Sequence, residues 1–290
     1  MKYPRLFPPG KTKEIRLSEK PQTILTWLPG AGGMLRAKVF LPAPGPDGKC
    51  PMVIIMHGIM TTKDVYPQPA IAKALQAKGI ASVTFDFNGH GGSYGKFRGM
   101  TVLNEKEDAL KVIGYAASLP FVSRIGLAGH SQGGVVAALC AGEIAKGHCE
   151  IADRLAAVLL MAPAAVCRDD ALNGNIMGAT FDPSEPPDIL KVMMHELGGD
   201  YIRVAQQLDI YGEAADYHGP MCVIHGEKDG TVPVRYGKMF KSVCPQCDLH
   251  ILPQEGHLLN GDKTGVCSMA TDFLVRSLLL FNRQELFHSD

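Results

Sequence analysis

From about residue 50 onward, short apolar runs alternate with longer amphipathic segments. The apolar runs predict strands, and most are apolar enough to be buried on both faces, as parallel strands are. These strands are expected at residues 52–56, 80–85, 124–128, 155–161, 221–225 and 248–252. The amphipathic segments predict helices near residues 65–78, 102–118, 132–146, 234–242 and 264–281. Residues 35–41, which precede a turn rich in proline and glycine, predict an antiparallel edge strand.

The alternation of strands and helices implies right-handed crossovers and a mostly parallel central sheet flanked by helices, an α/β fold. It is interrupted once, between residues 164 and 219, where glycines and prolines accompany helical pieces near 188–197 and 200–210. A stretch of that length between two core strands predicts an inserted cap, or lid. Ligands of open α/β sheets bind beyond the carboxyl ends of the strands, so the cap would cover the site. We therefore expect a core of residues 1–163 and 220–290 with a cap at 164–219.

Length, composition and charge indicate which kinds of fold and of binding partner are expected. With 290 residues, 46% of them hydrophobic, the chain can bury one large core that carries an insertion. Lysine plus arginine and aspartate plus glutamate number 29 each, so neither nucleic acid nor an anionic membrane is an expected partner. Residues 1–5 lead into no apolar stretch like that of a signal peptide, and residues 278–281 are too short a run to span a bilayer. We expect a soluble cytoplasmic protein, and a homodimer is compatible with the sequence.

The eight cysteines do not change this picture, because disulfide frameworks are typical of small secreted chains. Cys140, Cys222 and Cys267 lie in apolar patterns and are interpreted as core residues. The spacing of Cys244 and Cys247 could suit a redox pair or half of a zinc site. Neither a thioredoxin-like context nor a second pair of ligands is evident, so a structural role is preferred.

A candidate nucleophile lies at residues 129–133 (GHSQG), between the strand predicted at 124–128 and a helix. The pattern G-x-S-x-G in a strand–turn–helix setting is the nucleophile elbow of α/β-hydrolases. The turn is so tight that a side chain on either flanking glycine would collide with the backbone, and it exposes the serine hydroxyl. Ser131 is therefore the expected nucleophile.

The same pattern occurs a second time, at residues 91–95 (GGSYG). This copy lies several residues beyond the strand predicted to end at Phe85 and leads into KFRG, not into a helix. A strained turn without a strand and a helix to hold it lacks support. Ser93 is therefore interpreted as a loop residue.

A serine hydroxyl needs a base to become nucleophilic, and the base needs an orienting carboxylate. In α/β-hydrolases the order along the chain is serine, acid, histidine. Asp229 follows the strand at 221–225, and His257 lies on the loop after the strand at 248–252. This pair is preferred as acid and base. The rivals are Glu227 for the acid, and His225 and His250 for the base.

The oxyanion formed during acyl transfer needs preorganised N–H donors. One donor is expected to be the backbone N–H of Gln132, directly after the nucleophile. The other is assigned to the N–H of Ile59, in the loop after the strand at 52–56. The sequence HGG at 90–92 competes for this role but follows the wrong strand. No Walker loop, dinucleotide fingerprint or H-E-x-x-H pair occurs, so neither a cofactor nor a metal is expected.

Beyond the elbow, longer segments of the chain resemble the cinnamoyl (feruloyl) esterases of gut and rumen bacteria, which are α/β-hydrolases. The segments that carry this resemblance are DFNGHG at 86–91, MTVLNE at 100–105, GHSQGGVVA at 129–137 and AQQL at 205–208. The likeness runs from about residue 35 through the cap. It implies a serine carboxylesterase that cleaves esters of ferulate, caffeate or p-coumarate.

In that family the cap closes over the phenolic ring of the substrate. The resemblance implies that Asp170 and Tyr201 bind the hydroxyl or methoxy side of the aromatic acyl group. The alternatives are a helix cap for Asp170 and a packing role for Tyr201. Where the family tends to carry glutamine, this chain has Met177, whose thioether cannot donate a hydrogen bond to a phenol. A more apolar acyl group is therefore an alternative.

Two other functions fit the same residues. A general short-chain acylesterase, a monoglyceride lipase or a thioesterase would use the same three side chains. A receptor or scaffold that kept the hydrolase fold without catalysis is the alternative of a different class, because fold alone does not determine function.

Overall fold

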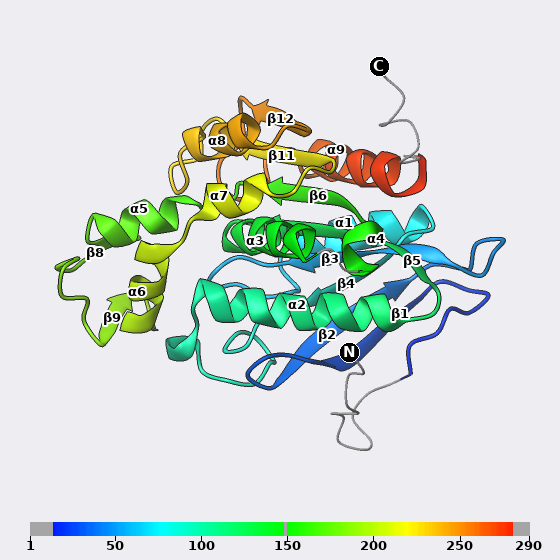
Figure 1. The fold of residues 1–290 in the computed structure, drawn as a ribbon, viewed down its shortest axis with the longest axis horizontal. Helices are drawn as coiled ribbons and strands as arrows, with labels where there is room; N and C mark the ends of the chain where they lie inside the picture. Colours follow the sequence, from blue (N-terminus) through cyan, green and yellow to red (C-terminus); the bar gives the residue numbers. More distant parts are fainter. Residues whose placement is uncertain (1–13, 148–149, 281–290) are drawn as a thin grey trace.

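The computed structural model describes residues 14–147 and 150–280 of the chain. Within them, one eight-stranded sheet has the strand order β1-β2-β4-β3-β5-β6-β11-β12 (Figure 1). Its strands are β1 (Gln22–Pro29), β2 (Met34–Leu41), β3 (Cys50–Met56), β4 (Ala81–Phe85), β5 (Val122–His130), β6 (Leu155–Met161), β11 (Met221–Gly226) and β12 (Cys247–Leu252). The strands from β4 to β12 in this order are parallel, whereas β1 and β2 are antiparallel to their neighbours. The predicted α/β-hydrolase fold is confirmed.

Helices cover both faces of the sheet (Figure 1). They are α1 (Gln68–Ala77), α2 (Val102–Ser118), α3 (Gln132–Lys146), α4 (Glu150–Arg154), α8 (Arg235–Val243) and α9 (Lys263–Val275), the last followed by a π-helix at Arg276–Leu280. In β3, Met52 and Ile54 join the core beneath α2, α3 and α8, while Val53 and Ile55 join the core beneath α1 and α9. A strand buried on both faces has to be apolar throughout, which is why the central strands could be recognised from the sequence.

The segment between β6 and β11 departs from the strand–helix alternation. It contains α5 (Val166–Leu172), β7 (Asn175–Ile176), β8 (Ala179–Thr180), β9 (Ile189–Val192), β10 (His195–Gly198), α6 (Gly199–Gln207) and α7 (Ile210–Ala215). Figure 1 shows α5, α6, β8 and β9 at one end of the molecule, beyond the sheet, with α7 close to α3. Phe97, in a short 3₁₀ helix of the core, packs against His195 of β10 with a ring-centroid distance of 5.0 Å and an interplanar angle of 47°, so the segment contacts the core there.

Two predictions of secondary structure are wrong. Residues 35–41 form an antiparallel strand, but not an edge strand, because β1 pairs along the outer side of β2. β1 was missed because burial alternates along it whereas residue polarity does not: Thr26 is buried and Leu25 is exposed. The helix predicted near 188–197 is instead the hairpin β9–β10, which turns at Met193 with a φ of 52° and buries alternate residues of β9.

Other boundaries agree to within a few residues, and the helices at 102–118 and 132–146 match α2 and α3. Residues 1–5, where a signal peptide is not expected, and residue 281, the predicted end of the last helix, lie outside the described residues. Across the part of the chain that the structure describes, no helix is both long and apolar enough to span a membrane.

Candidate active site

Ser131 lies at the turn between the end of β5 and the start of α3, with a φ of 57° and a ψ of −124°. Few residues other than glycine adopt such a φ, so the turn is strained. The two glycines of the elbow permit close approaches of the backbone. A Cβ on Gly129 would lie 2.0 Å from the carbonyl oxygen of Gly133, and a Cβ on Gly133 would lie 2.4 Å from that of His57. The sequence pattern thus has the steric cause that was inferred for it.

The loops after β11 and β12 bring two further side chains to this turn. His257 Nε2 lies 2.9 Å from Ser131 Oγ, and His257 Nδ1 lies 2.8 Å from Asp229 Oδ2. Hydroxyl, imidazole and carboxylate thus form one continuous hydrogen-bonded row. This is the arrangement in which an imidazole can take the hydroxyl proton while a carboxylate holds its tautomer.

Asp229 is held by more than His257. Its Oδ1 accepts from the N–H groups of Thr231 and Val232, at 2.9 and 2.7 Å. Burial raises the pKa of this carboxyl, but hydrogen bonds from His225 and His257 lower it by more. The pKa of Asp229 therefore lies well below its usual range. The carboxylate therefore stays ionised beside His257 at neutral pH.

In the described parts of the chain, the imidazole that hydrogen-bonds to Ser131 Oγ is that of His257 and not that of either rival histidine. His225 Nε2 lies 2.8 Å from the carbonyl oxygen of Val232 and 3.3 Å from Asp229 Oδ2, so it supports the acid. His250 is part of β12. His130, which the sequence interpretation passed over, places Nε2 2.8 Å from the carbonyl oxygen of His257. Burial lowers the pKa of His130 to about 4, so the ring is neutral and donates this hydrogen bond.

Ile59 and Gln132 line the same pocket as Ser131. Among the described residues, neither backbone N–H has a hydrogen-bond partner. Gln132 is the first residue of α3, where helical N–H groups are free and the helix dipole favours negative charge. Gly58 is needed beside Ile59, because a Cβ there would lie 2.8 Å from the Cβ of Ser131.

The loop that carries Ile59 is anchored by His57. Its Nε2 accepts from the N–H of Phe87 at 3.1 Å, so Nδ1 carries the proton and donates to the carbonyl oxygen of Gly58 at 2.7 Å. Burial, together with the neighbouring His90, lowers the pKa of His57 to about 3 and keeps the ring neutral. This contact holds Gly58 and Ile59 next to the nucleophile.

The pocket has a volume of about 870 Å³, and residues of the segment between β6 and β11 line it together with Ser131. Asp170, Tyr201 and Met177 all line it. Asp170 lies inside α5, whose N-cap is Ala165, so the helix-cap alternative is wrong. Burial, followed by repulsion from Asp169, raises the pKa of Asp170 to about 6.

Tyr201 and Met177 differ in exposure. Tyr201 is buried, and its hydroxyl donates to Gln132 Oε1 at 2.8 Å, which a purely apolar packing role would not require. Met177 is 43% exposed at a turn with a φ of 51°. The wall of the pocket therefore has two polar groups, the buried Tyr201 and the partly buried Asp170, together with an exposed thioether.

Residues 49–179 match the family described as serine aminopeptidase, S33. The structure of Est1E from Butyrivibrio proteoclasticus with bound ferulic acid is 30% identical in sequence and has a TM-score of 0.80, covering 87% of this chain and 98% of that chain. The chain belongs to the feruloyl-esterase-like α/β-hydrolases.

Curated proteins match shorter parts of this α/β-hydrolase. An uncharacterized 31.7 kDa protein of Escherichia coli, from the traX-finO intergenic region, is 36% identical over 93 residues, which are 31% of this chain and 32% of that protein. Human protein ABHD12B is 26% identical over 194 residues, which are 66% of this chain and 49% of that protein. The match thus spans about a third of the first relative's length and about half of the second's.

The second G-x-S-x-G pattern of this α/β-hydrolase is part of a different structure. Ser93 lies in the loop between β4 and the 3₁₀ helix at Phe97–Gly99. Its Oγ donates to the carbonyl oxygen of Asp86 at 2.6 Å and accepts from the N–H of Arg36 at 2.8 Å. Ser93 therefore joins this loop to β2, as a structural loop residue does.

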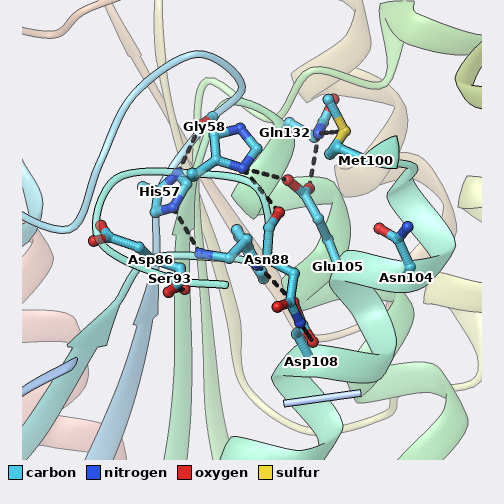
Figure 2. Close-up of polar contacts among 12 residues, drawn as sticks. His57, Gly58, Asp86, Asn88, Ser93, Met100, Asn104, Glu105, Asp108 and Gln132 are labelled. Carbon is cyan, nitrogen blue, oxygen red and sulfur yellow. Dashed lines mark hydrogen bonds and ion pairs between the residues drawn. The ribbon is translucent and has the colours of Figure 1, made fainter. Parts of the chain in front are cut away.

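Sequence reasoning missed Glu105, a buried carboxyl on α2 behind the elbow (Figure 2). Its Oε2 accepts from Gln132 Nε2 at 2.7 Å. Burial raises the pKa of Glu105 to about 8. The only signal in the sequence was its place in MTVLNE at 100–105, one of the segments that carry the resemblance.

Cys244 and Cys247 are buried free thiols, and burial raises the pKa of each, to about 11 and about 12. Cys244 Sγ contacts the carbonyl oxygen of Ala214. Within residues 14–147 and 150–280, no group of three or more histidine, cysteine, aspartate or glutamate residues could hold a metal ion. A packing role explains both thiols.

Proposed function

We propose that this α/β-hydrolase is a serine carboxylesterase that cleaves esters of hydroxycinnamic acids through an acyl-Ser131 intermediate. The observation that carries the proposal is the hydrogen-bonded row from Ser131 through His257 to Asp229, beside a pocket with polar groups in its wall. A site used only for binding would not require this row. The same observation argues against a non-catalytic receptor.

The reaction follows from the geometry. His257 Nε2 takes the proton of Ser131 as Oγ attacks the ester carbonyl carbon, and Asp229 stabilises the imidazolium that forms. The negative charge on the former carbonyl oxygen is bound by the free N–H groups of Ile59 and Gln132. When the intermediate collapses, His257 returns the proton to the departing alcohol. Water, deprotonated by the same histidine, then attacks the acyl-serine and releases the carboxylic acid.

The substrate class is supported by the pocket and by the bound ligand of a relative. The pocket is large enough for an aromatic acyl group, and Asp170 and Tyr201 supply oxygen atoms that can meet ring hydroxyls. Est1E, 30% identical to this chain, holds ferulic acid. Met177 adds a thioether in place of a donor, so we propose that methoxy contacts there are apolar. We also propose that residues 164–219 act as a cap over this pocket.

A panel of esters tests the substrate class. Hydrolysis of methyl ferulate and chlorogenate is compared with that of p-nitrophenyl butyrate, with kcat/KM as the readout. We expect both hydroxycinnamate esters to be preferred, with a burst of product equal to the enzyme concentration if deacylation is slow. A substantially higher kcat/KM on butyrate would instead favour a short-chain acylesterase, a monoglyceride lipase or a thioesterase with the same three residues. The cytoplasmic location, the absence of a cofactor and the homodimer stay predictions.

A further inference from the structure

Three buried side chains form a hydrogen-bonded chain behind the nucleophile. Gln132 Nε2 donates to Glu105 Oε2 at 2.7 Å, and Tyr201 Oη donates to Gln132 Oε1 at 2.8 Å. The chain thus joins α2 of the core, the first residue of α3, and α6 of the segment between β6 and β11. The exposed fractions are only 1% for Glu105, 2% for Gln132 and 3% for Tyr201, so water does not compete for these bonds.

The orientation of the Gln132 amide is determined by what surrounds it. Figure 2 shows its nitrogen between the carboxyl of Glu105 and the sulfur of Met100, which lie 2.7 and 3.4 Å away. A thioether sulfur can only accept, and Glu105 Oε2 accepts here. Turning the amide over would place its carbonyl oxygen against the sulfur, which cannot donate, and would require the Glu105 proton on Oε2. The amide therefore keeps its nitrogen toward α2 and its oxygen toward Tyr201.

This orientation decides what Tyr201 can offer to a ligand. A phenol has one proton, and that of Tyr201 is donated to Gln132 Oε1. Burial raises the pKa of Tyr201 well above its ordinary value, so the proton is retained. The remaining capacity of the Tyr201 oxygen is a lone pair. Toward the pocket that it lines, Tyr201 is an acceptor.

Glu105 keeps its role as acceptor in either protonation state. Burial raises its pKa to about 8, which favours the neutral acid at neutral pH. Its Oε1 has no hydrogen-bond partner within the described parts of the chain and lies 3.8 Å from His90 Nδ1. His90 is itself neutral, because burial lowers its pKa to about 4. The acid proton can reside on Oε1, which leaves Oε2 free to accept from Gln132.

We propose that Glu105 is a specificity-determining positioning residue, which acts through Gln132 to make Tyr201 a hydrogen-bond acceptor only and so selects acyl groups that carry a phenolic O–H. The inference rests on the proposed function, since it assigns the polarity of the same pocket. A ring with a free hydroxyl donates to Tyr201, whereas the same ring with a methoxy group offers only a second acceptor. Sites built around a specific hydrogen bond discriminate strongly against ligands that lack the partner.

The test compares kcat/KM for methyl p-coumarate and methyl 4-methoxycinnamate, which differ in that one proton. We expect the unmodified protein to favour the p-coumarate ester about tenfold or more, as one buried hydrogen bond allows. Glu105→Leu removes the acceptor, releases the Gln132 amide and should lower this ratio by most of that factor. Glu105→Gln keeps a carbonyl acceptor at the same position and should retain most of the ratio. Asp170 is unchanged throughout, so its own contribution cancels when the ratio of each variant is divided by that of the unmodified protein.

A double-mutant cycle separates this role from general support of the fold. In the Tyr201→Phe background, the ratio should already be low, and Glu105→Leu should not change it further. If Glu105→Leu instead lowers kcat/KM for both esters by the same factor, Glu105 supports only the structure and the inference is wrong. Thermal unfolding of each variant shows whether folding is retained, and Glu105→Gln and Tyr201→Phe keep the test available if Glu105→Leu does not fold.

Calorimetric binding of the two free acids to the Ser131→Ala variant distinguishes this inference from the proposed function. Loss of ester hydrolysis on all cinnamates would remove the proposed function but leave this measurement intact. We expect p-coumarate to bind about tenfold tighter than 4-methoxycinnamate, and the added Glu105→Leu change to abolish the difference. Equal affinities of the two acids before that change would overturn the inference.

Discussion

The pattern G-x-S-x-G occurs twice in this chain, at residues 129–133 and at 91–95, and the two copies have different structures. The first copy joins β5 directly to α3, and its serine has a φ of 57°. The second lies in a loop between a strand and a short 3₁₀ helix. The same five-residue pattern therefore produces a strained elbow only where a strand and a helix hold its ends.

The partners of the two serine hydroxyls differ as much as the backbones do. Ser131 Oγ meets an imidazole, that of His257, at 2.9 Å. Ser93 Oγ is saturated by main-chain groups, the carbonyl of Asp86 and the N–H of Arg36. A hydroxyl bound to a base can become a nucleophile, whereas one bound to backbone groups fixes a loop. The comparison teaches that the surroundings of the motif carry the chemistry.

The largest expected difference between the two copies is in activity. Ser131→Ala should lower kcat on the best ester by a factor on the order of 10⁴ or more, because the nucleophile is lost. Ser93→Ala should change kcat by no more than about twofold, since its hydroxyl contacts only main-chain groups. Steady-state assays of both purified variants measure this. Full activity of Ser131→Ala would break the comparison at once.

Replacing a glycine in each copy tests the comparison through the free energy of unfolding. Gly129→Ala should destabilise the fold by about 4 kcal/mol or more, because its Cβ would lie 2.0 Å from a backbone oxygen that cannot move away. At Gly92, which occupies the variable second position of the other copy and is not one of its two pattern glycines, the Cβ would lie 3.2 Å from the flexible side chain of Arg36, and a cost of about 1 kcal/mol or less is expected. Urea unfolding gives both values, and similar costs at the two glycines would contradict the strained-elbow account.

Glu105, the carboxyl behind the first copy, should make the stability of the fold depend on pH. Burial raises the pKa of Glu105 to about 8, well above 4.5. The folded state thus retains a proton that the unfolded chain has lost, so stability should fall as pH rises from 6.5 to 8. The expected loss is on the order of 2 kcal/mol, and it should be absent in Glu105→Gln.

This pH window separates Glu105 from the buried histidines. Burial lowers the pKa of His57 to about 3 and that of His90 to about 4. These histidines therefore lower the stability of the fold as pH falls, and they do so only below about pH 6.5, the pKa of an exposed histidine. Urea unfolding at pH 6.5 and at pH 8 therefore isolates the carboxyl. An unchanged pH dependence in Glu105→Gln would show that Glu105 is ionised in the folded state at neutral pH.

The smallest expected effect is on stability, where replacing Ser93 should cost more than replacing Ser131. Ser93→Ala should cost about 1 kcal/mol of stability, because the hydrogen bond to the N–H of Arg36 and that to the carbonyl of Asp86 are lost. Ser131→Ala should be neutral or slightly stabilising, since active-site residues are commonly held at a cost to stability. Chemical unfolding curves of the two variants provide the test. A larger loss for Ser131→Ala would mean that its hydroxyl is structural.

Much of the core could be predicted from the sequence because its signals are local. β6 was expected at 155–161 and lies at Leu155–Met161, since a strand buried on both faces is an unbroken apolar run. The half-buried β1 was missed, and the hairpin β9–β10 was taken for a helix. These strands form because each pairs with a neighbouring strand. A segment of four to eight residues does not show which strand will pair with it.

The active site likewise contains residues that local sequence signals predict and residues that they do not. The positions of Asp229 and His257 could be predicted because both follow strand ends, and the structure places His257 within hydrogen-bonding distance of both Asp229 and Ser131. The chain from Glu105 through Gln132 to Tyr201 could not be predicted. Its hydrogen bonds join residues 27 and 69 positions apart, and they depend on how α6 packs behind the elbow.

Labelling with a fluorophosphonate most directly tests the claim that Ser131, and not Ser93, is the activated hydroxyl. The reagent reacts covalently with a serine whose proton is taken by a neighbouring base. We predict one adduct per chain by intact mass, located at Ser131 by peptide mapping, retained in Ser93→Ala and lost in Ser131→Ala. An adduct on Ser93, or undiminished labelling of Ser131→Ala, would contradict the account.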